Sequence, residues 1–126
     1  MQCSVNLKLV RLFGFELEIL SDAKFSDYPL IKKSDLTKTE SIALNDSVIR
    51  HFYGDLPESA NIIKSVESNY LLTLSKINHA AEIIFKSHSP NILLAYMVAY
   101  VENSPWLSNA KKNNARIVHV ASTQFD

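Results

Sequence analysis

The fold is decided by residues 57–106, which read PESANIIKSVESNYLLTLSKINHAAEIIFKSHSPNILLAYMVAYVENSPW. Prolines stand at positions 57, 90 and 105, and a serine precedes each of the last two. A serine side chain accepts a hydrogen bond from the first turn of a helix, and a proline fixes a helical φ where no N–H is needed. The stretch and its continuation to Ala121 therefore predict three consecutive helices, over 57–87, 90–103 and 105–121.

The spacing of apolar residues supports the first two of these helices. Between Ile62 and Phe85 they recur at intervals of three and four residues, which is typical of an amphipathic helix. From Ile92 to Val101 every residue is apolar, which favours a central, buried helix. Ala95 and Ala99 lie four apart and predict a strip where another helix approaches closely, which makes them candidates for the dimer contact.

The last predicted helix is ambiguous at its end. Trp106, Leu107 and Ala110 suit a helix, whereas the run Ile117–Val120 suits a strand. Residues 116–121 are therefore left open between the two. If they form a strand, it could pair with an N-terminal ribbon.

That ribbon is predicted for residues 4–20. Apolar residues fall mainly on odd positions, with polar ones between them: Val5, Leu7, Leu9, Phe13, Phe15, Leu17 and Ile19. Alternation over this length favours two short strands with a bend near 11–14. A helix is the competing interpretation, because Leu9, Leu12, Phe13, Leu17 and Leu20 also fit helical spacing.

A further helix is predicted over 37–53. Thr37 and Glu40 have capping-box spacing, and Gly54 is a suitable C-terminal cap. The apolar face consists of Ile42, Leu44, Val48, Ile49 and Phe52. The sequence as a whole predicts an α+β fold, with a short N-terminal ribbon packed on about four helices. An all-α fold is the alternative.

Composition indicates an ordinary globular protein. The 126 residues suggest a single domain, 1–126, and 47% of them are hydrophobic. Thirteen basic and thirteen acidic side chains give zero formal net charge, so little long-range repulsion opposes self-association. One cysteine, Cys3, and no apolar run longer than about half a membrane span predict a cytoplasmic location and no membrane association.

Several classes of catalytic site find no support. With only Gly14 and Gly54, neither a P-loop nor a dinucleotide fingerprint can be written. No serine lies in a nucleophile elbow, and Cys3 lies near the terminus. His79 and Glu82 are the best acid/base pair, but a di-metal bundle would need a second such pair. We expect no metal and no cofactor, and the sequence leans against an enzyme.

Basic residues cluster late in the chain, at Lys111, Lys112 and Arg116, with Lys32 and Lys33 as further candidates. Nucleic-acid binding requires such charges on one face. Cations near the end of a helix also interact favourably with its dipole, and this interpretation is preferred. Nucleic acid is therefore an unlikely partner.

The aromatic residues are the most informative functional candidates. Tyr96 and Tyr100 are one helical turn apart if 90–103 is a helix, and Trp106 and Tyr70 could join them around a ligand or partner. The leading hypothesis is a small binding or accessory protein, of the inhibitor, immunity or regulatory type, that contacts a protein partner and forms a homodimer. The alternatives are a domain that binds a small apolar or aromatic ligand, and an enzyme assembled from distant residues.

Overall fold

The computed structural model describes residues 27–95 and 100–120. In these residues the chain forms the 3₁₀ turn η2 (Lys33–Asp35), helices α2 (Lys38–His51), α3 (Ala60–His88) and α4 (Ser104–Lys112), and strands β1 (Ile92–Ala95) and β2 (Arg116–His119). A mixed helix-and-sheet fold is thus confirmed, with three helices in this part of the chain instead of about four. The ribbon predicted for 4–20 lies outside the described residues.

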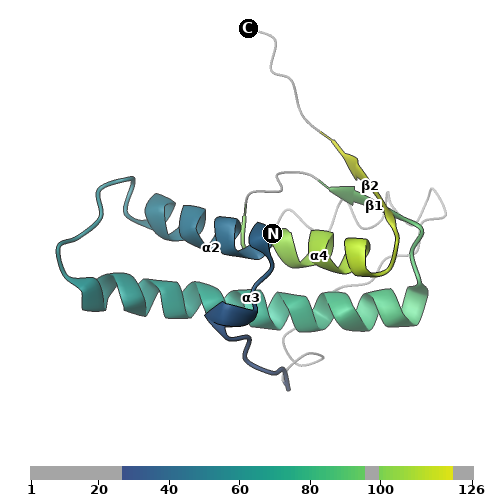
Figure 1. Ribbon diagram of the computed structural model, residues 1–126, viewed down its shortest axis with the longest axis horizontal. Helices are drawn as coiled ribbons and strands as arrows, with labels where there is room; N and C mark the ends of the chain where they lie inside the picture. The colour runs from purple at the N-terminus through teal and green to yellow at the C-terminus, as the bar shows by residue number, and fades with distance from the viewer. Residues whose placement is uncertain (1–26, 96–99, 121–126) are drawn as a thin grey trace, which may run out of the picture.

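Helices α2 and α4 both pack against α3 (Figure 1). The 29 residues of α3 span about 43 Å at 1.5 Å per residue. Helix α2 lies along its first half and α4 along its second half, so that α2 and α4 follow one another end to end. The side chains of Thr37 and Ser108 join the two shorter helices, with 3.1 Å between the hydroxyl oxygens.

Both ends of α2 are capped by the residues that the sequence predicts. The Thr37 hydroxyl accepts from the Glu40 N–H at 3.3 Å, and the Glu40 carboxylate accepts from the Thr37 N–H at 2.8 Å. Both halves of the predicted capping box are therefore formed. After His51 the chain turns through left-handed conformations at Tyr53 and Gly54, and the Gly54 N–H donates to the Ile49 carbonyl at 2.9 Å.

The predicted helix over 90–103 is wrong at residues 92–95, which form β1. Ser89 adopts a left-handed conformation, and its N–H caps the Phe85 carbonyl. Pro90 follows directly, so the serine–proline pair ends α3 where it was expected to begin a new helix. Periodicity cannot separate a short strand from a buried helix in a continuous apolar run. Ala95 belongs to β1 and not to a helical strip, and Ala99 lies outside the described residues.

The last segment combines both interpretations. Helix α4 ends at Lys112, and Arg116–His119 form β2, so the predicted helix over 105–121 is too long. Strand β2 pairs in parallel with β1, in the register Ile92 with Arg116 and Ala95 with His119. Helix α4 lies between the two strands in sequence and contacts both of them. The arrangement is a βαβ unit, in which a helix makes the crossover that parallel strands require.

The core lies where α2 and α4 meet α3. Its largest fully buried apolar side chains are Leu44 of α2, Leu74 of α3 and Val101 before α4. Small residues such as Ala81 and Ala110 are also fully buried, which allows α3 and α4 to approach closely. The segment before α2 is fixed to α3 by a hydrogen bond from the Ile31 N–H to Ser75 Oγ at 3.0 Å.

None of the helices in 27–95 and 100–120 combines the length and the apolar character required to cross a bilayer.

Candidate binding surface

Helix α2 carries apolar side chains on two opposite sides. Glu40, Ala43, Leu44, Ser47 and Val48 are buried, and they occupy the side that faces the rest of the molecule. Ile42 and Ile49 are 56% and 47% exposed. At 3.6 residues per turn these two lie one above the other, roughly opposite Leu44. The predicted apolar face of α2 is therefore divided, and part of it faces solvent.

The exposed apolar area continues past the end of α2. Tyr53 is 98% exposed, and Leu56 and Ile62 are also exposed at the same end of the α2–α3 hairpin. We call Ile42 and Ile49 on the outer side of α2, together with Tyr53 in the turn that follows the helix, the α2 outer stripe. Single exposed apolar side chains are common on protein surfaces, whereas a run along one helix side indicates a contact surface.

A cation lies beside this stripe, on the last turn of α2. Arg50 Nε donates to Asp46 Oδ2 at 2.6 Å, and the guanidinium carbon lies 5.1 Å from the centre of the Tyr100 ring. The hydrogen bond and the negative charge of Asp46 both raise the pKa of Arg50 above its ordinary value. Arg50 therefore stays positively charged and connects α2 to the segment that leads into α4.

The predicted aromatic residues lie in separate surroundings. Tyr70 of α3 makes an edge contact with His51, with 6.0 Å between ring centres. Tyr100 contacts Arg50, as described above, and Tyr96 lies outside the described residues. Trp106 lines a pocket of about 240 Å³ between β1 and α4, together with Leu93, Leu94, Ala95 and Asn103. Tyr70 and Tyr100 are not part of that lining.

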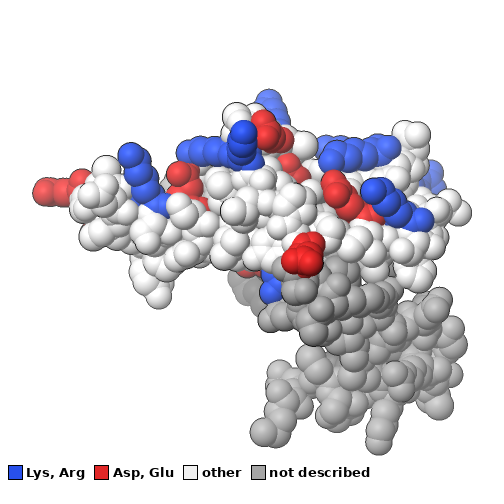
Figure 2. Space-filling model, turned by 90° about the horizontal axis from the view of Figure 1, so that it is seen from below, with Lys and Arg blue, Asp and Glu red and all other residues white. Residues whose placement is uncertain are grey.

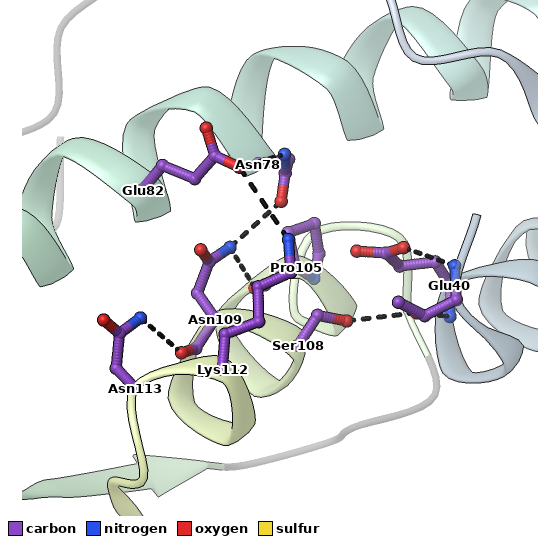
Figure 3. Close-up of polar contacts among 9 residues, drawn as sticks. Glu40, Asn78, Glu82, Pro105, Ser108, Asn109, Lys112 and Asn113 are labelled. Carbon is purple, nitrogen blue, oxygen red and sulfur yellow. Dashed lines mark hydrogen bonds and ion pairs between the residues drawn. The ribbon is translucent and has the colours of Figure 1, made fainter. Parts of the chain in front are cut away.

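A network of amides joins α3 to α4 (Figure 3). Asn109 is 1% exposed, and its amide nitrogen donates to Asn78 Oδ1 at 3.0 Å and to the Pro105 carbonyl at 2.9 Å. Asn78 in turn donates to Glu82 Oε1 at 3.3 Å. Both hydrogens of the Asn109 amide are thereby satisfied in a buried position. The network fixes α4 on α3 and offers no open site.

The lysine cluster is partly neutralised. Lys112 lies 3.8 Å from Glu82, and Lys33 forms an ion pair with Glu67. Glu67 and Glu82 are about 22 Å apart along α3, so Lys33 and Lys112 do not belong to one patch. Figure 2 shows basic and acidic side chains interspersed over the face that it presents. This distribution favours the structural interpretation of these lysines over a phosphate-binding one.

In the predicted acid/base pair of His79 and Glu82, the Glu82 carboxylate already interacts with other side chains. Glu82 accepts from Asn78 and pairs with Lys112, while His79 is half-buried on the same helix. Within residues 27–95 and 100–120, no three His, Cys, Asp or Glu side chains are grouped so as to hold a metal ion.

Comparison of the chain with models of known protein families, with curated proteins and with solved structures finds no match.

Two features of these surfaces escaped the sequence analysis. The sequence analysis placed Ile42 and Ile49 on the same apolar face as Leu44 and Val48, whereas in the structure Ile42 and Ile49 are exposed and Leu44 and Val48 are buried. The exposed side chains of β1 were missed because residues 90–103 were expected to be helical.

Proposed function

We propose that this chain is a small binding protein that acts through contacts with protein surfaces, in the manner of an inhibitor, immunity or regulatory protein, and that it forms a homodimer. The observation that carries the proposal is the α2 outer stripe, whose isoleucines lie on the opposite side of α2 from its buried residues. Burying large apolar side chains is the main favourable contribution to protein association.

The spacing along α2 suits a contact between two copies. In a two-fold symmetric interface the same surface is used by both subunits. If two α2 helices pack antiparallel about an axis near Asn45 and Asp46, Ile42 of one copy lies opposite Ile49 of the other. The neutral net charge of the chain adds no long-range repulsion to this arrangement.

The stripe alone is smaller than a stable interface. Such interfaces bury about 800 Å² on each partner, more than a few side chains supply. Tyr53, Leu56 and Ile62 extend the apolar area at the hairpin end. Tyrosine is enriched among residues that dominate binding energies, which makes the almost fully exposed Tyr53 the natural anchor of the contact.

The double variant Ile42→Asp/Ile49→Asp tests this surface. Two carboxylates in an apolar contact lose solvation without gaining partners, so we expect the dissociation constant of the dimer to rise by at least about 100-fold. Light scattering should give twice the 14.2 kDa chain mass for the unmodified protein and a single chain mass for the variant.

A matched control is Leu72→Asp. It places one aspartate, the same substitution as at each stripe position, on an exposed apolar residue of α3. This variant should remain a dimer. A monomeric unmodified protein at high micromolar concentration, or equal weakening by all three substitutions, would contradict the proposal.

The pocket beside Trp106 supports a second candidate function, the binding of a small apolar or aromatic molecule. Its volume of about 240 Å³ is near the lower end for ligand sites and suits a single ring. Leu93, Leu94, Ala95 and Trp106 line it together with the polar residue Asn103.

The only tryptophan of the chain reports on that pocket directly. Titration with toluene should change Trp106 fluorescence in a saturable manner and raise the melting temperature. In the variant Ala95→Leu, which fills the pocket, the same titration should have no effect. The absence of any saturable change in the unmodified protein would exclude this use of the pocket.

A further inference from the structure

The exposed side of α2 follows a regular spacing. Lys38, Ile42, Asn45 and Ile49 are all exposed, and they lie four, three and four residues apart. At 3.6 residues per turn, these four positions fall within about 60° of one another around the helix axis. Intervals of four and three residues are those of the contact positions in paired helices. The exposed side of α2 therefore has the pattern of a helix–helix seam, with an asparagine near its middle.

This spacing is complementary to itself when a second copy runs in the opposite direction. The antiparallel arrangement described above places Ile42 of one copy opposite Ile49 of the other. The same arrangement places Lys38 at the height of Tyr53 of the other copy. It also brings the two Asn45 residues to within about 2 Å of the same height, beside the two-fold axis.

We propose that Asn45 sets the direction and register of this contact, an inference that rests on the homodimer proposed above. At the axis, the carboxamide of one Asn45 donates an N–H to the side-chain oxygen of the other and accepts one in return. A shift by about one turn in either direction would bring each amide against an isoleucine, where its N–H groups lack a partner. A single asparagine in an apolar seam specifies register in this way.

The charge at the start of α2 favours the antiparallel direction. Lys38 is the first residue of α2, at the positive end of the helix dipole. Within residues 27–95 and 100–120 its ammonium forms no ion pair. An antiparallel copy brings this ammonium to the negative end of the other α2, beside the ring of Tyr53, which is 98% exposed. A parallel copy would instead place the two Lys38 ammonium groups together, which is unfavourable.

Asp46 also lies near the axis, next to Asn45. Two carboxylates at this height would repel each other if they carried no counter-charge. Arg50 Nε donates to Asp46 Oδ2 at 2.6 Å, so each carboxylate has a cation of its own chain beside it. The charged groups around the axis are therefore balanced within each copy.

Disulfide trapping in the full chain tests the direction and the register. Cys3→Ser removes the only native cysteine, and Lys38→Cys and Tyr53→Cys are introduced in separate chains on this background. A disulfide forms only where the two cysteines come within a few ångströms of each other. After mixing and mild oxidation, the disulfide between positions 38 and 53 should exceed the 38–38 and 53–53 disulfides by at least about tenfold.

The variant Asn45→Leu tests the role of the amide. Because the contact no longer desolvates two amides, the dissociation constant of the dimer should fall by at least about tenfold. The 38–38 disulfide should then appear beside the 38–53 disulfide, since the apolar seam no longer specifies one direction. Asn69→Leu, the same substitution at an exposed position of α3, should change neither the dissociation constant nor the disulfide pattern.

Three results would overturn the inference. The first is a predominance of 38–38 or 53–53 disulfides in chains that retain Asn45. The second is an unchanged or raised dissociation constant in Asn45→Leu. The third is a dimer that Ile42→Asp/Ile49→Asp dissociates but that traps no 38–53 disulfide, which removes this inference and leaves the homodimer in place. A monomeric unmodified protein at high micromolar concentration would remove both.

Discussion

Replacement of Leu74 by alanine is expected to lower the free energy of unfolding by about 3 kcal/mol, within the range of about 2–5 kcal/mol for fully buried leucines. Leu74 is fully buried near the middle of α3. Its removal leaves a cavity in the core. Because whole domains are stable by only about 5–15 kcal/mol, the variant should unfold at a clearly lower denaturant concentration.

Leu72 provides the matched control for this substitution. It lies two residues away on the same helix and is 45% exposed. Both substitutions have the same effect on helix propensity, so the difference between them isolates burial. Leu72→Ala should cost less than about 1 kcal/mol in urea unfolding. Similar costs for the two variants would contradict the packing of α3 described here.

Replacement of Asn109 by alanine is the second change with a large expected effect. The variant loses two buried hydrogen bonds and leaves the Pro105 carbonyl and Asn78 Oδ1 without that donor. An unsatisfied buried polar group costs about 1–3 kcal/mol, so we expect destabilisation of about 2 kcal/mol.

Asn113 is the control for Asn109. It is exposed, and its amide donates to the Asn109 carbonyl at 2.8 Å at the end of the same helix. Asn113→Ala should cost about 0.5 kcal/mol. A double-mutant cycle between Asn78 and Asn109 should give a coupling of about 1 kcal/mol. Additive effects would show that the amide network does not hold α4 on α3.

The sequence predicted helix ends correctly where residues within a single turn determine the cap. The capping box of Thr37 and Glu40 requires two side chains three residues apart, and both of its hydrogen bonds are present. Pro105 lies in the first turn of α4 as predicted, but the helix begins at Ser104 after Asn103, and no side chain caps it, so the predicted serine cap is wrong. Long amphipathic spacing identified α3, although the helix begins at Ala60 and not at Pro57.

Residues 92–95 were mispredicted for a reason that lies outside their own sequence. An apolar run can be a buried helix or a buried strand, and the choice depends on its partner. That partner is β2, which begins at Arg116, more than twenty residues later. The left-handed conformation of Ser89 also contributes, because it turns the chain away from α3 before Pro90.

The candidate surfaces were the least predictable part. The apolar residues of α2 were assigned to one face, but only Leu44 and Val48 are buried, and Ile42 and Ile49 are exposed. Contacts with α3 and α4 decide that, and they arise from residues distant in sequence. The exposure of Leu94 likewise depends on the pairing of β1 with β2 and on the position of α4.

We propose that two copies meet through the α2 outer stripe. The most direct test is a nuclear Overhauser measurement on a mixture of isotope-labelled and unlabelled full-length chains, filtered to detect contacts between copies only. Cross-peaks from the Ile42 methyl groups of one copy to those of Ile49 of the other are the predicted result. A dimer without any contact between copies at Ile42, Ile49 or Tyr53 would contradict it.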